Sequence, residues 1–252
     1  MNFPFSRTSR RLPPRAAPAI LPFQTDVFAP VLPGQHESLD ALERSIRLLR
    51  GLAGAGVRKA VGVVPVMNTY YPHTAERIQE TFLTVRAQLQ ADRIPLDLIP
   101  AAAYYIDQGL MRLLYQQTPL LTFGDPDRPY LLFETGLLKA PAELDNVLWA
   151  FRMLRLTPIM AHPEHCLYLQ QQPERLFRLK ELGVQFQVNL LSLVGKPTPG
   201  SRRLAEWMID HDLVTFLGSG LSQEFQLPLL EHAVTLPHFC KALEKGLDNH
   251  LV

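Results

Sequence analysis

The sequence predicts an α/β fold in which about seven parallel strands alternate with helices around a barrel. Hydrophobic residues recur at helical spacing in several segments, and short apolar runs typical of buried strands separate those segments. The chain has 252 residues, of which 47% are hydrophobic, so it is long enough for a full core and short enough for one domain. About seven strands suit a barrel better than an open sheet.

Three helices are predicted from hydrophobic residues that recur every three or four positions. The first begins near residue 38, the second covers about residues 72–90, and the third covers about residues 141–154, with Pro141 in its first turn. Each helix should bury one face against the sheet. The expected buried residues are Leu39, Leu42, Ile46 and Leu49 in the first helix, Ile78, Phe82, Val85 and Leu89 in the second, and Leu144, Val147, Leu148, Phe151 and Leu154 in the third.

Seven apolar runs are predicted to form the strands of the barrel. In a barrel of parallel strands, the residues at the carboxyl ends lie on one face, and the chemistry of such folds is found there. The residues that end the runs are therefore the candidates for a functional site. The runs are Phe23–Phe28, Val57–Val66, Leu96–Ala103, Tyr130–Phe133, Pro158–Ala161, Val184–Val188 and Val214–Leu217.

Composition excludes several classes of protein. Lysine and arginine number 25 against 24 acidic residues, a balance that gives no electrostatic basis for nucleic-acid binding. No run approaches the roughly 18 apolar residues of a transmembrane helix. Cys166 and Cys240 are too few for a disulfide framework and lie in no zinc-finger spacing, so a cytoplasmic location is expected.

The beginning of the chain differs from the rest. Residues 1–19 contain four arginines and no acidic residue, and Pro18 and Pro22 interrupt the apolar stretch that a secretory signal would need. We interpret residues 1–19 as a basic, flexible arm and residues 20–252 as a single barrel domain. Contact of the arm with anionic lipid or a partner is the alternative.

Four motifs lie at the predicted strand ends: Leu32-Pro-Gly34, Ala161-His-Pro-Glu164, Phe186-Gln-Val-Asn-Leu-Leu-Ser-Leu193 and Phe216-Leu-Gly-Ser219. They resemble motifs of one enzyme family, occur in that family's order, and the resemblance covers roughly residues 20–235. The chain is similar to the bacterial manganese-dependent protein-tyrosine phosphatases of capsule and exopolysaccharide clusters, which belong to the polymerase and histidinol phosphatase (PHP) superfamily. The resemblance implies a PHP-type distorted (β/α)7 TIM-like barrel with a cluster of divalent metals that binds phosphate and activates water.

Compared with the pattern of that family, the chain departs at six positions where metal ligands are expected. The replacements are apolar or small, so a mere change of metal preference does not account for them. His162 is interpreted as the only retained ligand, and Asp26 as a cap or loop residue. The six positions are Phe28, Pro30, Val66, Ala103, Gly220 and Ser222.

The remaining polar residues leave two interpretations open. His162, Glu164 and His165 are the residual catalytic candidates, and His36 and Glu37 could join them in a rearranged metal site. Alternatively, His162 and Glu164 are hydrogen-bonded residues that hold a loop.

Two hypotheses for the function follow from the resemblance. The first is a non-catalytic pseudophosphatase of capsule or exopolysaccharide regulation that uses no cofactor and binds a partner such as a tyrosine-kinase tail or an export protein. The second is an active metal-dependent protein-tyrosine phosphatase with a rearranged site. We favour the first, in which activity is absent or strongly impaired, because loss of so many charged ligands removes transition-state stabilisation. Tyr70, Tyr71, Tyr104 and Tyr105 lie near strand ends and could line a recognition pocket.

Overall fold

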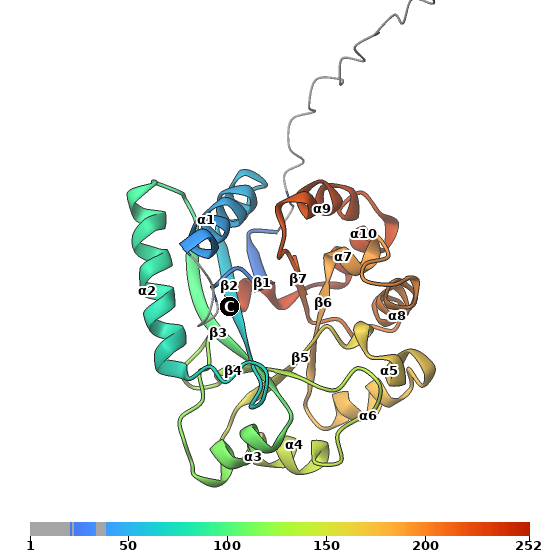
Figure 1. The fold of residues 1–252 in the computed structure, drawn as a ribbon. Coiled ribbons are helices and arrows are strands. Elements are labelled where there is room, and N and C mark those ends of the chain that lie inside the picture. Colours follow the sequence, from blue (N-terminus) through green and yellow to red (C-terminus); the bar gives the residue numbers. More distant parts are fainter. Residues whose placement is uncertain (1–20, 22, 34–38) are drawn as a thin grey trace, which may run out of the picture.

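The computed structural model describes residues 21, 23–33 and 39–252 and confirms the predicted α/β barrel (Figure 1). Its seven strands form one sheet in the order β1-β2-β3-β4-β5-β6-β7, and every neighbouring pair is parallel. A bulge interrupts the pairing of β1 with β2 between Asp26 and Ala29. The strands are β1 (Thr25–Ala29), β2 (Lys59–Val66), β3 (Asp97–Tyr105), β4 (Tyr130–Glu134), β5 (Thr157–Ala161), β6 (Gln185–Asn189) and β7 (Phe216–Gly218).

Helices lie outside the strands and connect them, as parallel pairing requires. The α-helices are α1 (Leu39–Gly54), α2 (Ala75–Ala91), α3 (Gln108–Tyr115), α4 (Leu144–Met153), α5 (Leu167–Gln171), α6 (Arg175–Glu181), α7 (Leu190–Leu193), α8 (Pro199–Asp210), α9 (Leu227–Ala233) and α10 (Pro237–Lys245). The 3₁₀ helices are η1 (Pro163–His165), η2 (Glu224–Gln226) and η3 (Asp248–Leu251).

The predicted buried faces agree with the structure in α2 and deviate in α4. Ile78, Phe82, Val85 and Leu89 are all buried in α2, which begins after the Thr74 cap rather than at Pro72. In α4 the helix begins at Leu144, three residues after Pro141, and Leu154 lies beyond its last turn with 49% of its surface exposed. The spacing of hydrophobic residues therefore predicted the buried face of α2 correctly, whereas the helix predicted over about residues 141–154 is longer than the observed α4.

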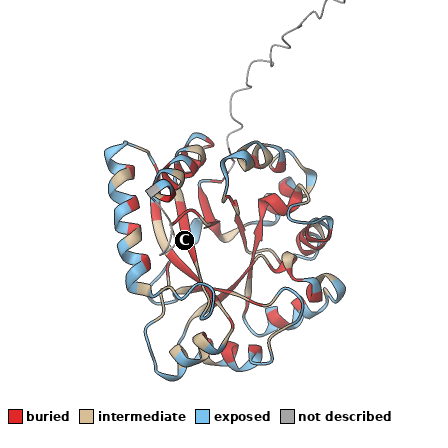
Figure 2. Ribbon diagram, in the orientation of Figure 1, coloured by how far each residue is buried: buried red, intermediate tan, exposed pale blue. Residues whose placement is uncertain are grey.

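Apolar side chains form two clusters, one on each side of the strands. The outer cluster packs the strands against the helices and includes Val64, Ala102 and Phe133. The inner cluster fills the barrel, and its members alternate with the outer set along β2 and β3 as strand geometry dictates. Figure 2 shows the result, with buried strands at the centre and exposed outer faces on the helices. The inner cluster consists of Val27, Phe28, Val61, Val63, Ala101, Ala103, Phe123, Leu132, Ile159, Ala161, Phe216 and Val252.

Backbone and side-chain hydrogen bonds close the barrel between β1 and β7, a junction here called the seam. β1 and β7 lie at opposite ends of the sheet order, and the backbone N–H of Gly220 donates to Phe28 O across the seam at 3.0 Å. Oδ1 of Asp26, a fully buried residue, accepts from the N–H groups of Phe28 at 3.1 Å and Ser219 at 2.8 Å. Asp26 is therefore inside β1, and its interpretation as a cap or loop residue is wrong.

Asn249 joins the seam nearer the amino-terminal ends of the strands. Its Nδ2 donates to Thr25 O and Leu217 O, both at 2.7 Å, and its Oδ1 accepts from Leu217 N at 3.0 Å. The side-chain amide thus makes the hydrogen bonds that a neighbouring strand would make in a ladder.

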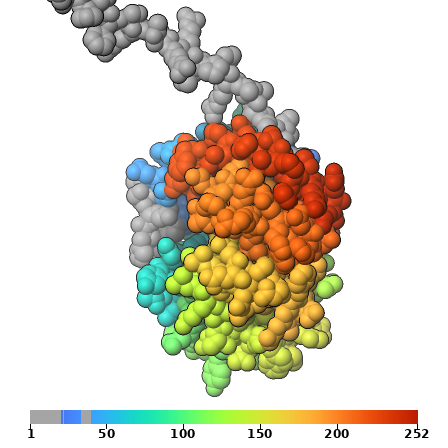
Figure 3. Space-filling view, turned by 90° about the vertical axis from the view of Figure 1, so that its right-hand side faces the viewer, coloured from blue at the N-terminus to red at the C-terminus, as the bar shows by residue number. Residues whose placement is uncertain are grey.

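The later helices cover one side of the barrel. Figure 3 shows this side, where the segments coloured yellow to red form a continuous surface. Among the described helices, none is long and apolar enough to cross a membrane. The predicted arm of residues 1–19 lies outside the described residues.

Candidate active site

A cavity of about 440 Å³ opens at the carboxyl ends of β2 to β5, the face where the sequence predicted a functional site. Its walls are mostly apolar, and its polar groups come from the ends of β3, β4 and the turn after β5. A cavity of this size is within the range of small-molecule sites. The lining residues are Pro65, Val66, Met67, Tyr71, Ala103, Tyr105, Glu134, Thr135, Leu137, Ala161, His162, His165 and Cys166.

His162 directly follows β5, and its side chain lines the cavity. Its backbone is left-handed, with φ 34° and ψ 53°, which is uncommon for a residue other than glycine. The His162 N–H donates to Gln187 O at 2.8 Å and thereby anchors the turn to β6. The imidazole lies edge-on to the Phe28 ring, with the centroids 5.1 Å apart, and Nδ1 is buried with no hydrogen-bond partner in the described part of the chain.

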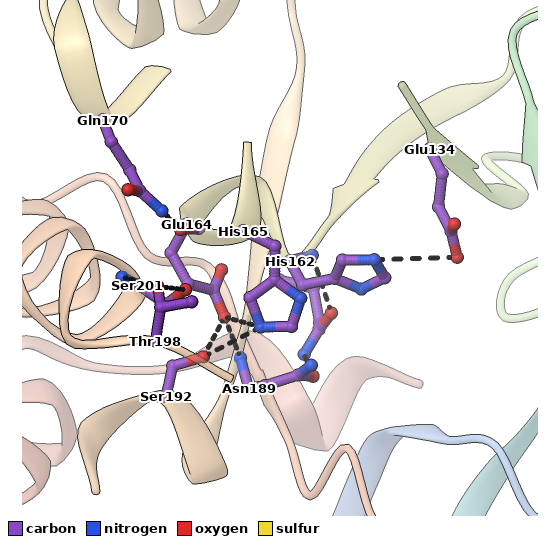
Figure 4. Close-up of polar contacts among 10 residues, drawn as sticks. Glu134, His162, Glu164, His165, Gln170, Asn189, Ser192, Thr198 and Ser201 are labelled. Carbon is purple, nitrogen blue, oxygen red and sulfur yellow. Dashed lines mark hydrogen bonds and ion pairs between the residues drawn. The ribbon is translucent and has the colours of Figure 1, made fainter. Parts of the chain in front are cut away.

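Glu134 is a residue that the predicted site did not include. It is the last residue of β4, and its Oε1 lies 3.8 Å from His162 Nε2, as the right-hand side of Figure 4 shows. The Glu134 carboxylate makes no hydrogen bond within the described residues. The available signal was its position, since it is the first acidic residue after the apolar run of residues 130–133.

Glu164 lies beside the cavity, does not line it, and is fully buried. Its Oε1 accepts from the backbone N–H of Asn189 at 2.9 Å and from Ser192 Oγ at 2.7 Å (Figure 4). His165 Nε2 lies 3.1 Å from the same hydroxyl and 3.6 Å from Glu164 Oε1. These contacts join the turn after β5 to the end of β6 and the start of α7, so Glu164 holds the rim of the site.

Burial shifts the pKa values of four residues in and beside the cavity, which are Glu134, His162, Glu164 and His165. It lowers the pKa of His162 to about 4, and burial together with the neighbouring His162 lowers the pKa of His165 to about 3. Burial raises the pKa of Glu134 to about 7, and it raises the pKa of Glu164 to about 7 against its hydrogen bonds. Both imidazoles are therefore uncharged at neutral pH.

The structure places two of the six substituted positions in the apolar interior of the barrel. Phe28 is 5% exposed and Ala103 is 1% exposed, and both belong to the inner cluster. Val66 and Ala103 also line the cavity. Packed hydrocarbon thus occupies the strand ends where ligands were expected.

The other substituted positions lie in the loops after β1 and β7. Pro30 follows β1 and is half-buried. Gly220 has φ +63°, and a Cβ at this position would lie 2.8 Å from Asn189 Cγ. Ser222 donates through its N–H to Gln226 Oε1 at 2.9 Å, which ties the loop to η2. This loop conformation disfavours any side chain at Gly220.

Replacing Phe28 with histidine is expected to lower the free energy of unfolding by about 2 kcal/mol, because an imidazole would be buried in the inner cluster without a hydrogen-bond partner. The control Phe28→Leu should cost less than about 1.5 kcal/mol, since it keeps the site apolar. Urea unfolding measures both. A histidine variant as stable as the parent chain, or one that manganese stabilises, would show that the position still accepts a metal ligand.

The candidate residues of the sequence prediction are thus only partly brought together. His162 and His165 line the cavity, with ring centroids 4.7 Å apart, whereas Glu164 does not line it. His36 and Glu37, named for a rearranged site, lie outside the described residues. Tyr71 and Tyr105 line the cavity. Tyr104 does not line it and is buried, and its Oη accepts a hydrogen bond from the backbone N–H of Leu121 at 2.7 Å.

The chain matches a known protein family over most of its length. The family model described as "Capsular polysaccharide synthesis, CpsB/CapC" matches residues 24–236. The chain is 22% identical over 194 residues to the tyrosine-protein phosphatase YwqE of Bacillus subtilis (strain 168), covering 77% of this chain and 75% of the relative. It is 26% identical over 187 residues to the tyrosine-protein phosphatase CpsB of Streptococcus pneumoniae, covering 71% of this chain and 74% of the relative.

A solved structure shares the fold. It comes from crystal structures of YwqE and CpsB described as "unique metal-dependent tyrosine phosphatases", with a TM-score of 0.72 and 20% sequence identity, and the match covers 88% of this chain and 85% of that chain. At this sequence identity the match shows that the two chains share a fold.

The comparison corrects the expectation that no cofactor is used. That expectation is wrong, because the solved relatives are described as metal-dependent. In this chain, His162 Nε2 and the Glu134 carboxylate are the cavity groups placed to hold one divalent ion, whose charge would serve to bind phosphoryl oxygens. No group of three or more His, Cys, Asp or Glu side chains that could hold a metal occurs among the described residues. The described side chains therefore do not fit the metal cluster that the resemblance implied.

Proposed function

Because this chain belongs to the CpsB/CapC family of capsular polysaccharide synthesis, whose relatives are tyrosine-protein phosphatases, we propose that it is a non-catalytic or strongly impaired member of that family. It acts in capsule or exopolysaccharide regulation by binding a partner such as the tail of a bacterial tyrosine kinase. The barrel provides the binding site, and the chemistry of the relatives is reduced or absent.

The observation that carries this proposal is the apolar packing of the strand ends. Phosphate transfer needs positive charge held in place around the phosphoryl group, supplied by metals or by cationic side chains. Here Phe28 and Ala103 belong to the inner cluster, and among the described residues no lysine or arginine lines the cavity. The described side chains therefore provide no fixed positive charge around a phosphoryl group, and a single ion on His162 and Glu134 would be held by few ligands.

The surroundings of the cavity support binding of a partner. Leu137 and Tyr71 line the cavity and are 56% and 50% exposed, and the adjacent Leu138 and Tyr70 are each 75% exposed. Exposed apolar and aromatic groups near a pocket are typical of protein recognition surfaces.

An assay of phosphotyrosine hydrolysis tests the proposal. The full chain is incubated with a phosphotyrosine peptide and excess manganese, so that a missing ion cannot explain a negative result, and phosphate release is measured beside that of Streptococcus pneumoniae CpsB. We expect a rate about a thousandfold or more below that of the relative, because mutational loss of even one electrostatic contact costs 10²–10³ in rate.

The matched variants are His162→Ala and Glu134→Gln. For a non-catalytic protein, neither variant changes the residual rate. A rate comparable to that of the relative, abolished by either variant, would establish the active phosphatase and overturn the proposal.

A further inference from the structure

The geometry points to a cavity that selects the unphosphorylated tyrosine side chain and rejects phosphotyrosine, the reverse of a phosphatase pocket. This inference rests on the proposed function and names the ligand of the same site.

The charge of the cavity disfavours phosphate. Of the thirteen described residues that line it, Glu134 is the single carboxylate, and none is lysine or arginine. Glu134 closes one side of the cavity at the end of β4, with 24% of its side chain exposed. In the absence of a bound ion and above pH 7, where Glu134 is mostly ionised, a phosphate group in this space would meet a carboxylate with no cationic side chain among the described residues to offset the repulsion.

The hydrogen-bonding groups lead to the same selection. The Glu134 carboxylate makes no hydrogen bond within the described residues, so it presents free acceptors to the cavity. A phenol O–H can donate to them in a charge-assisted hydrogen bond. An ionised phosphate ester offers acceptors alone, so its oxygens would face the acceptor oxygens of Glu134 wherever that carboxylate is ionised. The loss of one proton donor on phosphorylation thus changes an attractive contact into a repulsive one.

The walls fit an aromatic ring. Val66, Met67, Ala103 and Leu137 provide apolar surface around the cavity, and Tyr71 at its edge is half exposed. A ring buried against these groups contributes through apolar area, and methionine beside an aromatic ring is a favourable contact. A lysine side chain would also pair with Glu134, but its ammonium would leave water for a mostly apolar space.

Binding of four short peptides tests the inference. The probes are acetylated Gly-Gly-X-Gly-Gly amides in which X is tyrosine, phosphotyrosine, phenylalanine or lysine, and affinity is measured at pH 8.5 by ligand-observed NMR titration with the full chain as purified and again with EDTA. Tyrosine should bind about tenfold more tightly than phosphotyrosine, and more tightly than phenylalanine, because only its neutral phenol O–H donates a hydrogen bond to the Glu134 carboxylate. Lysine should bind more weakly than tyrosine.

Two variants assign the effect to the cavity. Glu134→Gln removes the negative charge and supplies an N–H donor, so the preference for tyrosine over phosphotyrosine should fall to about threefold or less. Tyr71→Ala should weaken the tyrosine and phenylalanine probes alike and leave the tyrosine-to-phosphotyrosine ratio unchanged. Glu181→Gln, an exposed position on α6, should change neither quantity.

Each contrary result has a distinct meaning. Phosphotyrosine binding equal to or tighter than tyrosine binding overturns the inference, also if it appears only without EDTA, since a resident metal would then supply the missing positive charge. Tightest binding of lysine overturns it in favour of a cation site. Turnover in the manganese assay overturns the proposed function, whereas lost selectivity without turnover overturns this inference alone.

Discussion

Replacing Asn249 with alanine is expected to lower the free energy of unfolding by about 4 kcal/mol. Asn249 is 5% exposed, and its amide makes three buried hydrogen bonds, two to Leu217 and one to Thr25. Alanine leaves those three backbone groups without a partner, and each unpaired buried group costs about 1–3 kcal/mol. Urea unfolding followed by circular dichroism gives the value by linear extrapolation.

Two further variants separate this effect from a general response to substitution. Asn146→Ala makes the same change on the exposed face of α4 and should stay within about 0.5 kcal/mol of the parent chain. Asn249→Asp keeps the acceptor but places a carboxylate against two carbonyl oxygens, so at pH 7 it should cost more than alanine does. A loss below about 1 kcal/mol for Asn249→Ala would show that the seam does not depend on this amide.

Replacing Glu164 with glutamine is expected to change the pH dependence of stability by about 3 kcal/mol between pH 4.5 and pH 8. Burial raises the pKa of Glu164 from 4.5 to about 7, so between these values the folded chain holds a proton that the unfolded chain has released. The contribution of Glu164 to stability is therefore complete below pH 4.5 and is lost as the pH rises through 7. Glutamine does not titrate and does not show this loss.

The comparison must be made as a difference between the variant and the parent chain. The lowered pKa values of His162 and His165 act in the opposite direction, since they add stability as the pH rises from about 4 to 6.5. Subtracting the parent curve removes their contribution. Ser192→Ala, which removes one donor to Glu164, should steepen the loss at high pH. A difference that stays constant from pH 5 to pH 8 would contradict the raised pKa.

The strands and the main helix faces could be predicted because their signals are local. Alternating and three-to-four-residue spacing of hydrophobic residues indicates buried faces within one segment, and Ile78, Phe82, Val85 and Leu89 are all buried as expected. The seam could not be predicted in this way, because Asn249 bonds to residues 32 and 224 positions away. The residues around Asn249 in the sequence do not indicate that its side chain joins β1 to β7.

The sequence predicted where the candidate site lies, but it did not predict all of the residues that line it. The strand ends do converge, and His162 and His165 line the same cavity. Glu134 was not among the predicted site residues, because a carboxylate at the end of an apolar run has an ordinary structural explanation. Its proximity to His162, 3.8 Å between Oε1 and Nε2, depends on how β4 and β5 pair, which the sequence does not display.

The apolar cluster inside the barrel also limits the order in which this chain could change over generations. A first polar substitution at Phe28 or Ala103 would lose packing while no second ligand was yet present to share an ion with it. Gly220 adds a further obstacle, since its backbone conformation resists any side chain. The first substitutions toward a metal cluster would therefore lower the stability of the fold. A population carrying this barrel would need several replacements together, or a stabilising substitution elsewhere in the chain.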